Sequence, residues 1–185
     1  MSGEEIYSPD EVQSFQRVGE YLAWFARLEA VMDGSIIDIL NLEPTAGRLL
    51  LSFVSFSAKC NFLEELARAE GTGLTDTERK ETPSNIEKIR KIARRRNTIA
   101  HSMFEPTGGG IKFADATKKK LAADRSNVIQ HDVFDRDRLQ MGELWMWVAS
   151  TAAKIRAHGK QTQIAEAVLR ARLKVAEPEP GSKPN

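Results

Sequence analysis

The chain has 185 residues, of which 41% are hydrophobic and 29% are charged, and its formal net charge at pH 7 is +1. This length and apolar content suffice for one well-buried domain but not for two. The small net charge excludes a global basic field of the kind that drives non-specific binding to nucleic acids. A nucleic-acid-binding role would therefore have to come from a local patch.

Cysteine content and the N-terminal residues bear on the compartment of the protein. Cys60 is the only cysteine and lies in an apolar run, so it cannot form an intramolecular disulfide and is expected in the core. Residues 1–10 have no cationic start and no apolar stretch, and no apolar run in the chain approaches the length of a membrane span. We therefore expect a cytoplasmic protein that does not contact a membrane.

Two long helices are expected in the N-terminal part of the chain. Residues 8–11 (Ser-Pro-Asp-Glu) form a helix start, in which Ser8 is the N-cap and the glutamate completes a capping box. Apolar residues recur at helical spacing from there to Leu40. A second helix is expected over residues 46–70. Because its sequence is apolar on most sides near residues 49–56, we expect this helix to be central in the fold.

The next segment contains a third helix and a hairpin. The helix is expected to start at residues 82–85, with Ser84 as its N-cap, and to continue to His101. Residues 106–110 (Pro-Thr-Gly-Gly-Gly) form a turn between two short β-like pieces, which predicts a small hairpin.

The C-terminal part is expected to contain a fourth, apolar helix that Asp135 caps and that stops at Gly159. The fold class is therefore all-α: a helical bundle of four to five helices with a small β-hairpin insertion after the third helix. By position, we expect a flexible N-terminus (1–7), the bundle domain (8–160), a basic C-terminal helix (161–176) and a disordered tail (177–185).

Residues 96–101, Arg-Asn-Thr-Ile-Ala-His, form the least ordinary pattern of the chain. At about 100° per residue, Arg96 falls near the middle of an apolar arc, and Asn97 and His101 fall on the edge of that arc. Arg95, by contrast, is expected to point into solvent. A guanidinium keeps its proton, so its burial is costly unless a carboxylate or an anionic ligand neutralises it. Arg96 is therefore the residue that needs an explanation.

The first helix contains a carboxylate that could neutralise Arg96. Glu29 lies within the apolar stripe of that helix, and Asp33 lies one turn further on. We expect Glu29 and Arg96 to approach each other between the two helices, with Asp33 as the weaker candidate. Such a pair could serve a purely structural role, in which case His101 would be a surface histidine of the kind favoured near a helix C-terminus.

The arrangement of Arg96, a polar Asn97 and His101 resembles the signature motif of the HEPN superfamily (higher eukaryotes and prokaryotes nucleotide-binding domains). Its members are small helical bundles, and many are ribonucleases of toxin–antitoxin, phage-defence and RNA-processing systems. The context is similar too, since the motif lies late in a helix that follows two long helices. The sequence of residues 96–101, followed by a Gly-rich hairpin, resembles that of uncharacterised bacterial members of this superfamily. The resemblance covers residues 10–158.

By this resemblance, Arg96 matches the motif arginine, Asn97 the polar position and His101 the motif histidine. Glu29 is the candidate for the acidic residue that accompanies the motif in active members. The resemblance implies a ribonuclease that needs neither metal nor cofactor and that acts on RNA as a homodimer, with two motifs in one cleft. A toxin of this type would also have an antitoxin-type protein partner. The cations expected to line the cleft and hold phosphates are Arg90, Lys91, Arg94 and Arg95.

A second interpretation stays open beside the ribonuclease. The chain could be a non-enzymatic HEPN-like module that binds RNA, a nucleotide or a protein, with Glu29 and Arg96 as a structural pair. The cations of the motif helix would then be an ordinary solvated helix face.

Overall fold

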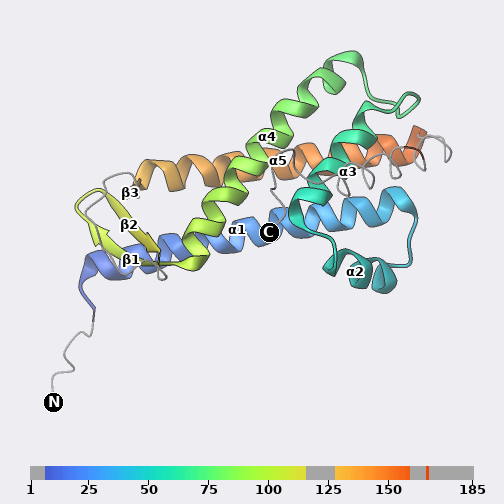
Figure 1. The fold of residues 1–185 in the computed structure, drawn as a ribbon. Coiled ribbons are helices and arrows are strands. Elements are labelled where there is room, and N and C mark those ends of the chain that lie inside the picture. Colours follow the sequence, from blue (N-terminus) through green and yellow to red (C-terminus); the bar gives the residue numbers. More distant parts are fainter. Residues whose placement is uncertain (1–6, 116–127, 159–165, 167–185) are drawn as a thin grey trace, which may run out of the picture. The chain divides into compact units, whose positions relative to one another are not determined.

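A computed structural model describes residues 7–115, 128–158 and 166 of the chain. In these residues, the helices are α1 (Pro9–Leu40), α2 (Pro44–Ser52), α3 (Phe56–Arg68), α4 (Asp76–His101) and α5 (His131–His158), and the strands are β1 (Ser102–Thr107), β2 (Gly110–Asp115) and β3 (Val128–Gln130) (Figure 1). The prediction of a helical bundle with a small β-hairpin insertion after the motif helix is confirmed. Apart from Glu166, which is helical, the predicted C-terminal helix and tail lie outside the described residues.

The contacts of the chain divide it into two compact units. The first consists of Met1–Leu28 and Lys91–Glu143, and the second consists of Glu29–Arg90 and Leu144–Asn185. The motif residues and the β-sheet belong to the first unit, whereas α2 and α3 belong to the second. Within the part of the chain that the structure describes, no helix has both the length and the apolar character needed to cross a bilayer.

The sheet of the first unit follows α4 without a linker, because β1 begins at the residue after His101. Its three strands are antiparallel in the order β1-β2-β3. The strands β1 and β2 form the predicted hairpin around the Gly-rich turn, and β3 was not expected. Gly110 is required here, since a Cβ atom at this position would lie 2.6 Å from the carbonyl oxygen of Ile129.

A chain of aromatic contacts anchors this sheet to α1 and α5 within the first unit. Successive ring centroids lie 5.2 to 6.5 Å apart. In order of contact, the rings are Tyr7, Phe15, Phe104, Phe113, Phe134 and Tyr21. Aromatic pairs of this kind add to the stabilisation that burial alone provides. The C-terminal end of α4 is therefore held in place by the aromatic packing of β1, the strand that follows it.

In the second unit, the expectation of one helix over residues 46–70 is wrong, because the segment forms two helices, α2 and α3, with a short non-helical connection between them. The hydroxyl of Ser55 accepts a hydrogen bond from the amide of Ala58 at 3.2 Å and so caps α3. The side chain of Phe53, just before this cap, is 84% exposed, and Leu49 is exposed as well. The apolar run that suggested a central helix therefore lies largely on the surface.

The helix that contains the motif starts earlier than expected. Thr75 and Glu78 form the capping box of α4: the amide of Thr75 donates to the Glu78 carboxylate at 2.9 Å, and the amide of Glu78 donates to the Thr75 hydroxyl at 3.3 Å. Pro83 consequently lies inside the helix rather than at its start. The α5 helix also starts early, since it begins at His131, and Asp135 forms an ion pair with Arg17 at 2.9 Å instead of capping the helix.

Candidate functional site

The C-terminal half of α4 has a narrow buried face. Ile92 and Ile99 are buried, whereas Ala100 is exposed. At about 100° per residue, Arg95 and Arg96 lie on the two flanks of this face. Asn97 and His101 lie on the opposite, exposed side of the helix, one turn apart. The prediction that Arg96 occupies the middle of the buried face is therefore wrong.

Arg96 is half-buried and interacts with an aromatic ring. Its guanidinium carbon lies 5.3 Å from the ring centroid of Phe25, which belongs to α1. Its Nη1 atom donates a hydrogen bond to the side-chain oxygen of Asn97 at 3.1 Å. These two contacts hold the guanidinium beside Asn97 and replace the carboxylate that we expected there.

Glu29 and Asp33, the two carboxylates expected near Arg96, are bound by a lysine in the second unit. The Nζ atom of Lys59 lies 3.4 Å from Glu29 and 3.0 Å from Asp33. Lys59 is only 4% exposed, so its ammonium needs these partners. Sequence reasoning missed this cation, because its neighbours from Phe53 to Cys60 looked like a plain apolar run. The expected Glu29–Arg96 pair is thus replaced by a different partner for each residue.

Arg95, expected in solvent, is the arginine that binds a buried carboxylate. Its guanidinium contacts Asp137 of α5, and its side chain is only 20% exposed. Asp137 itself is 3% exposed and also accepts a hydrogen bond from the hydroxyl of Tyr21 at 3.0 Å. No sequence pattern identifies this partner, because Asp137 lies in the first turns of α5 among other charged residues.

Tyr21, Arg95 and Asp137 form a largely buried cluster. Its environment changes the pKa of Tyr21 and the pKa of Arg95. Burial raises the pKa of Tyr21 well above its usual range, and the negative charge of Asp137 raises it further. For Arg95, burial opposes the positive charge, but the hydrogen bond to Asp137 and the charge of that carboxylate outweigh burial and raise the pKa. The cluster therefore consists of a neutral phenol beside the ion pair of Arg95 and Asp137.

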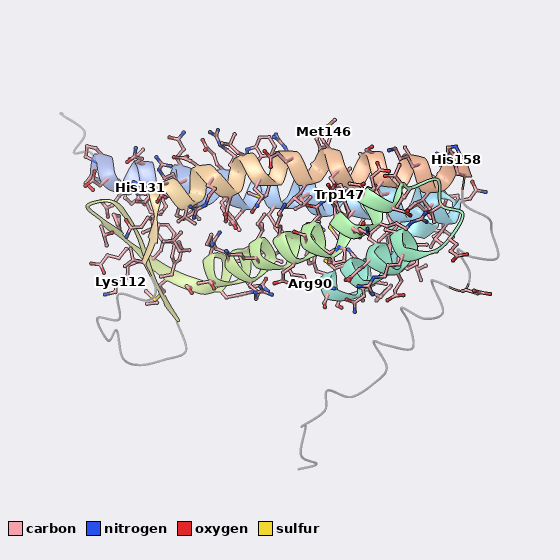
Figure 2. The ribbon with its side chains drawn as sticks, turned by 90° about the horizontal axis from the view of Figure 1, so that it is seen from above. Arg90, Lys112, His131, Met146, Trp147 and His158 are labelled. Carbon is pink, nitrogen blue, oxygen red and sulfur yellow. The ribbon has the colours of Figure 1, made fainter. Side chains whose placement is uncertain are left out.

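The four cations predicted to hold phosphates have different surroundings. Arg90, labelled in Figure 2, pairs with Glu64 at 3.0 Å and with Asn61 at 2.7 Å inside the second unit. Arg95 pairs with Asp137, whereas Lys91 and Arg94 are exposed.

Arg94 lies on the same side of α4 as Asn97 and His101, since these three residues are spaced by three and four positions. They form one exposed stripe, which we call the motif stripe. It places a cation, an amide and an imidazole along about two turns of the helix.

The other two histidines and the cysteine do not form a second group like the motif stripe. His131 and His158 are the first and last residues of α5 (Figure 2). Burial raises the pKa of the Cys60 thiol to about 12, so this group stays protonated at neutral pH, which is consistent with the predicted core position. Among the described residues, no three His, Cys, Asp or Glu side chains gather in a way that could hold a metal ion.

A groove in the second unit has a volume of about 640 Å³. Most of its lining consists of small side chains from α1 and α5, such as Ala30, Gly34 and Ala153. Its charged lining residues, Asp38 and Arg156, pair with each other at 3.6 Å. The chemistry of this lining is that of a packing surface, so the motif stripe and Arg96 are the stronger candidate site.

Comparisons with protein-family models, with curated proteins and with solved structures gave no match for this chain.

Proposed function

We propose that this chain is a metal-independent endoribonuclease of the HEPN type. The observation that supports the proposal most is the pairing of Arg96 with Asn97, together with the exposed His101 one turn beyond. A guanidinium, an amide and an imidazole are thus available at one end of α4. These are the groups that cleavage of a phosphodiester needs when the nucleophile comes from the substrate.

The proposed reaction uses the 2′-hydroxyl of RNA as the nucleophile. The 2′-oxygen forms a bond to phosphorus, and the bond between phosphorus and the 5′-oxygen breaks, which leaves a 2′,3′-cyclic phosphate and a 5′-hydroxyl. His101 accepts the proton of the 2′-hydroxyl or donates a proton to the leaving 5′-oxygen, because an imidazole exchanges protons near neutral pH. Arg96 stabilises the negative charge that develops on the phosphoryl oxygens.

A single motif supplies one histidine, whereas this reaction uses one acid and one base. We propose that a two-fold homodimer brings two copies of His101 to one substrate, so that each copy has one of these roles. Glu29 receives no catalytic role, because its carboxylate is bound by Lys59. We further propose that the protein acts in the cytoplasm. As a toxin or phage-defence component, it would also bind an antitoxin-type protein partner.

Cleavage of a fluorescently end-labelled, single-stranded RNA in the presence of a chelator tests the proposal. The wild-type protein should cleave with EDTA present and leave 2′,3′-cyclic phosphate ends. The variants His101→Ala and Arg96→Ala should lose at least about 100-fold in rate, as expected when a proton-transfer or charge-stabilising group is removed. Asn97→Ala should have a smaller effect, because it removes only a partner of Arg96.

His158→Ala is a matched control, since His158 is also an exposed histidine in the last turn of a long helix. This variant should retain full activity. Cleavage that disappears with EDTA, or full activity in folded His101→Ala protein, would refute the proposal. RNA that binds to the wild-type protein but stays intact would identify a binding module instead.

A further inference from the structure

We infer that Asp137 is a positioning residue for the proposed site: by binding Arg95, it fixes the rotation of the C-terminal half of α4 about its own axis, and so the direction in which Asn97 and His101 face. The effect on cleavage rests on the proposed function. The effect on the orientation of His101 does not.

The cluster ties together three helices within the first unit. Tyr21 comes from α1, Arg95 from α4 and Asp137 from α5. The hydroxyl of Tyr21 lies 3.0 Å from Asp137 and 3.3 Å from the carbonyl oxygen of Ile92. The side chain of Asp137 thus contacts α4 through Arg95, and Tyr21 contacts the α4 backbone one turn earlier. Two contacts at different heights on one helix oppose its rotation.

The buried position of Asp137 makes this arrangement specific. A carboxylate that is 3% exposed loses most of its hydration, so its free energy depends strongly on the hydrogen bonds that it accepts. If α4 rotated about its axis by one residue, about 100°, the guanidinium of Arg95 would move away from Asp137. The buried carboxylate would then have no cation beside it. The ion pair therefore selects one rotational setting of α4 and disfavours the others.

The motif follows this contact directly in the sequence. Arg96 is the next residue after Arg95, and its own side chain lies over Phe25 on the other flank of the buried face. Beyond His101, the contact between Phe104 and Phe113 holds β1 against β2. His101 is thus fixed from both sides, by the two arginine contacts before it and by the sheet after it.

The test compares Asp137→Asn with Asp135→Asn. Asp135 lies half a turn away on the same helix and pairs with Arg17, but its side chain is 54% exposed. In Asp137→Asn, the NMR signal of the His101 imidazole should shift or broaden, because the helix end loses its fixed orientation. On RNA, kcat should fall roughly 10- to 100-fold with little change in KM, as expected for a displaced catalytic group. Asp135→Asn should change neither readout, and Asp137→Glu should restore part of both.

His101 is assigned by the signal that the His101→Ala variant lacks, among the three histidines of the chain. A folded Asp137→Asn protein with an unchanged His101 signal and unchanged kcat would overturn the inference. If Asp137→Asn does not fold, Arg95→Lys is read in the same way, because it keeps the positive charge but removes the guanidinium that contacts Asp137. If the wild-type protein cleaves no RNA, the proposed function fails, and the His101 signal alone decides the positioning role.

Discussion

The guanidinium of Arg96 lies over the ring of Phe25, with 5.3 Å between its central carbon and the ring centroid. The first residue of the motif is therefore held by an aromatic face and by Asn97. This contact has a modest free energy, since a partly exposed cation over an aromatic ring contributes about 0.5–2 kcal/mol. A buried ion pair that loses one partner would cost about 3–5 kcal/mol.

The first prediction follows from that difference. Arg96→Ala should lower the free energy of unfolding by about 0.5–2 kcal/mol, as measured by urea denaturation. A double-mutant cycle with Phe25→Leu should give a coupling energy of about 0.5–1 kcal/mol, because each variant removes one partner of the same contact. Lys91→Ala, an exposed change on the same helix, should shift stability by less than about 0.5 kcal/mol. A loss above about 3 kcal/mol in Arg96→Ala would indicate a buried carboxylate partner instead.

Local signals in the sequence predicted those parts of the fold that local contacts determine. The capping box at Ser8 is formed, with the hydroxyl of Ser8 accepting from the amide of Glu11 at 3.3 Å. The Gly-rich turn after the motif helix likewise forms the predicted hairpin. In both cases, the interacting residues are neighbours in the chain. The pattern of residue types identified the structure in these two cases, whereas the same kind of local signal placed the N-caps of α4 and α5 wrongly at Ser84 and Asp135.

The partners of the two arginines could not be predicted in this way. Helical periodicity predicted Arg96 in the middle of the buried face and Arg95 in solvent, whereas the buried residues Ile92 and Ile99 leave both arginines at the edges of that face. Which edge receives a carboxylate depends on the packing of α5 and on the position of Asp137 in it. This is a tertiary contact between residues 42 positions apart, and no local signal encodes it. The same holds for Lys59, whose carboxylate partners lie on α1.

The second prediction concerns the break between α2 and α3. Ser55→Ala should destabilise the protein by about 0.5–2 kcal/mol, because the amide of Ala58 loses the hydroxyl that caps α3. The matched control is Ser57→Ala, an exposed position inside α3, where alanine is the better helix former and stability should stay equal or rise slightly. Both values come from urea denaturation. Equal stabilisation by the two changes would instead indicate one continuous helix.

The third prediction concerns alkaline pH. Burial and the charge of Asp137 raise the pKa of Tyr21, so the folded protein holds the phenol proton more tightly than the unfolded chain, in which a tyrosine has a pKa of about 10. The stabilisation linked to this proton is complete below about pH 10 and declines as the pH rises above that value. Tyr21→Phe should therefore weaken the loss of stability above pH 10.

The other tyrosine makes a direct measurement possible. The chain contains two tyrosines, so a Tyr7→Phe protein reports only on Tyr21. In that variant, tyrosinate absorbance should appear together with the loss of helical circular dichroism as the pH is raised. Tyrosinate that forms near pH 10 while the protein is still fully helical would contradict the buried environment of Tyr21.

The fourth prediction concerns the motif stripe of Arg94, Asn97 and His101. If RNA lies along this stripe, Arg94 contacts a phosphate beside the imidazole. Arg94→Ala should then weaken binding of single-stranded RNA several-fold and lower the slope of log K against log salt concentration by about 0.7, the value for one phosphate contact on a single strand. Fluorescence anisotropy measures both quantities, in a His101→Ala background that prevents cleavage.

Lys80→Ala provides the matched control for this measurement. Lys80 is also an exposed cation of α4, but it belongs to the second unit and lies near the opposite end of the helix. If RNA binds through a local contact with the motif stripe, this variant should keep the wild-type affinity and salt slope. If Lys80→Ala and Arg94→Ala weaken binding equally, RNA binds through charge spread along the helix, and the motif stripe has no special role in holding it.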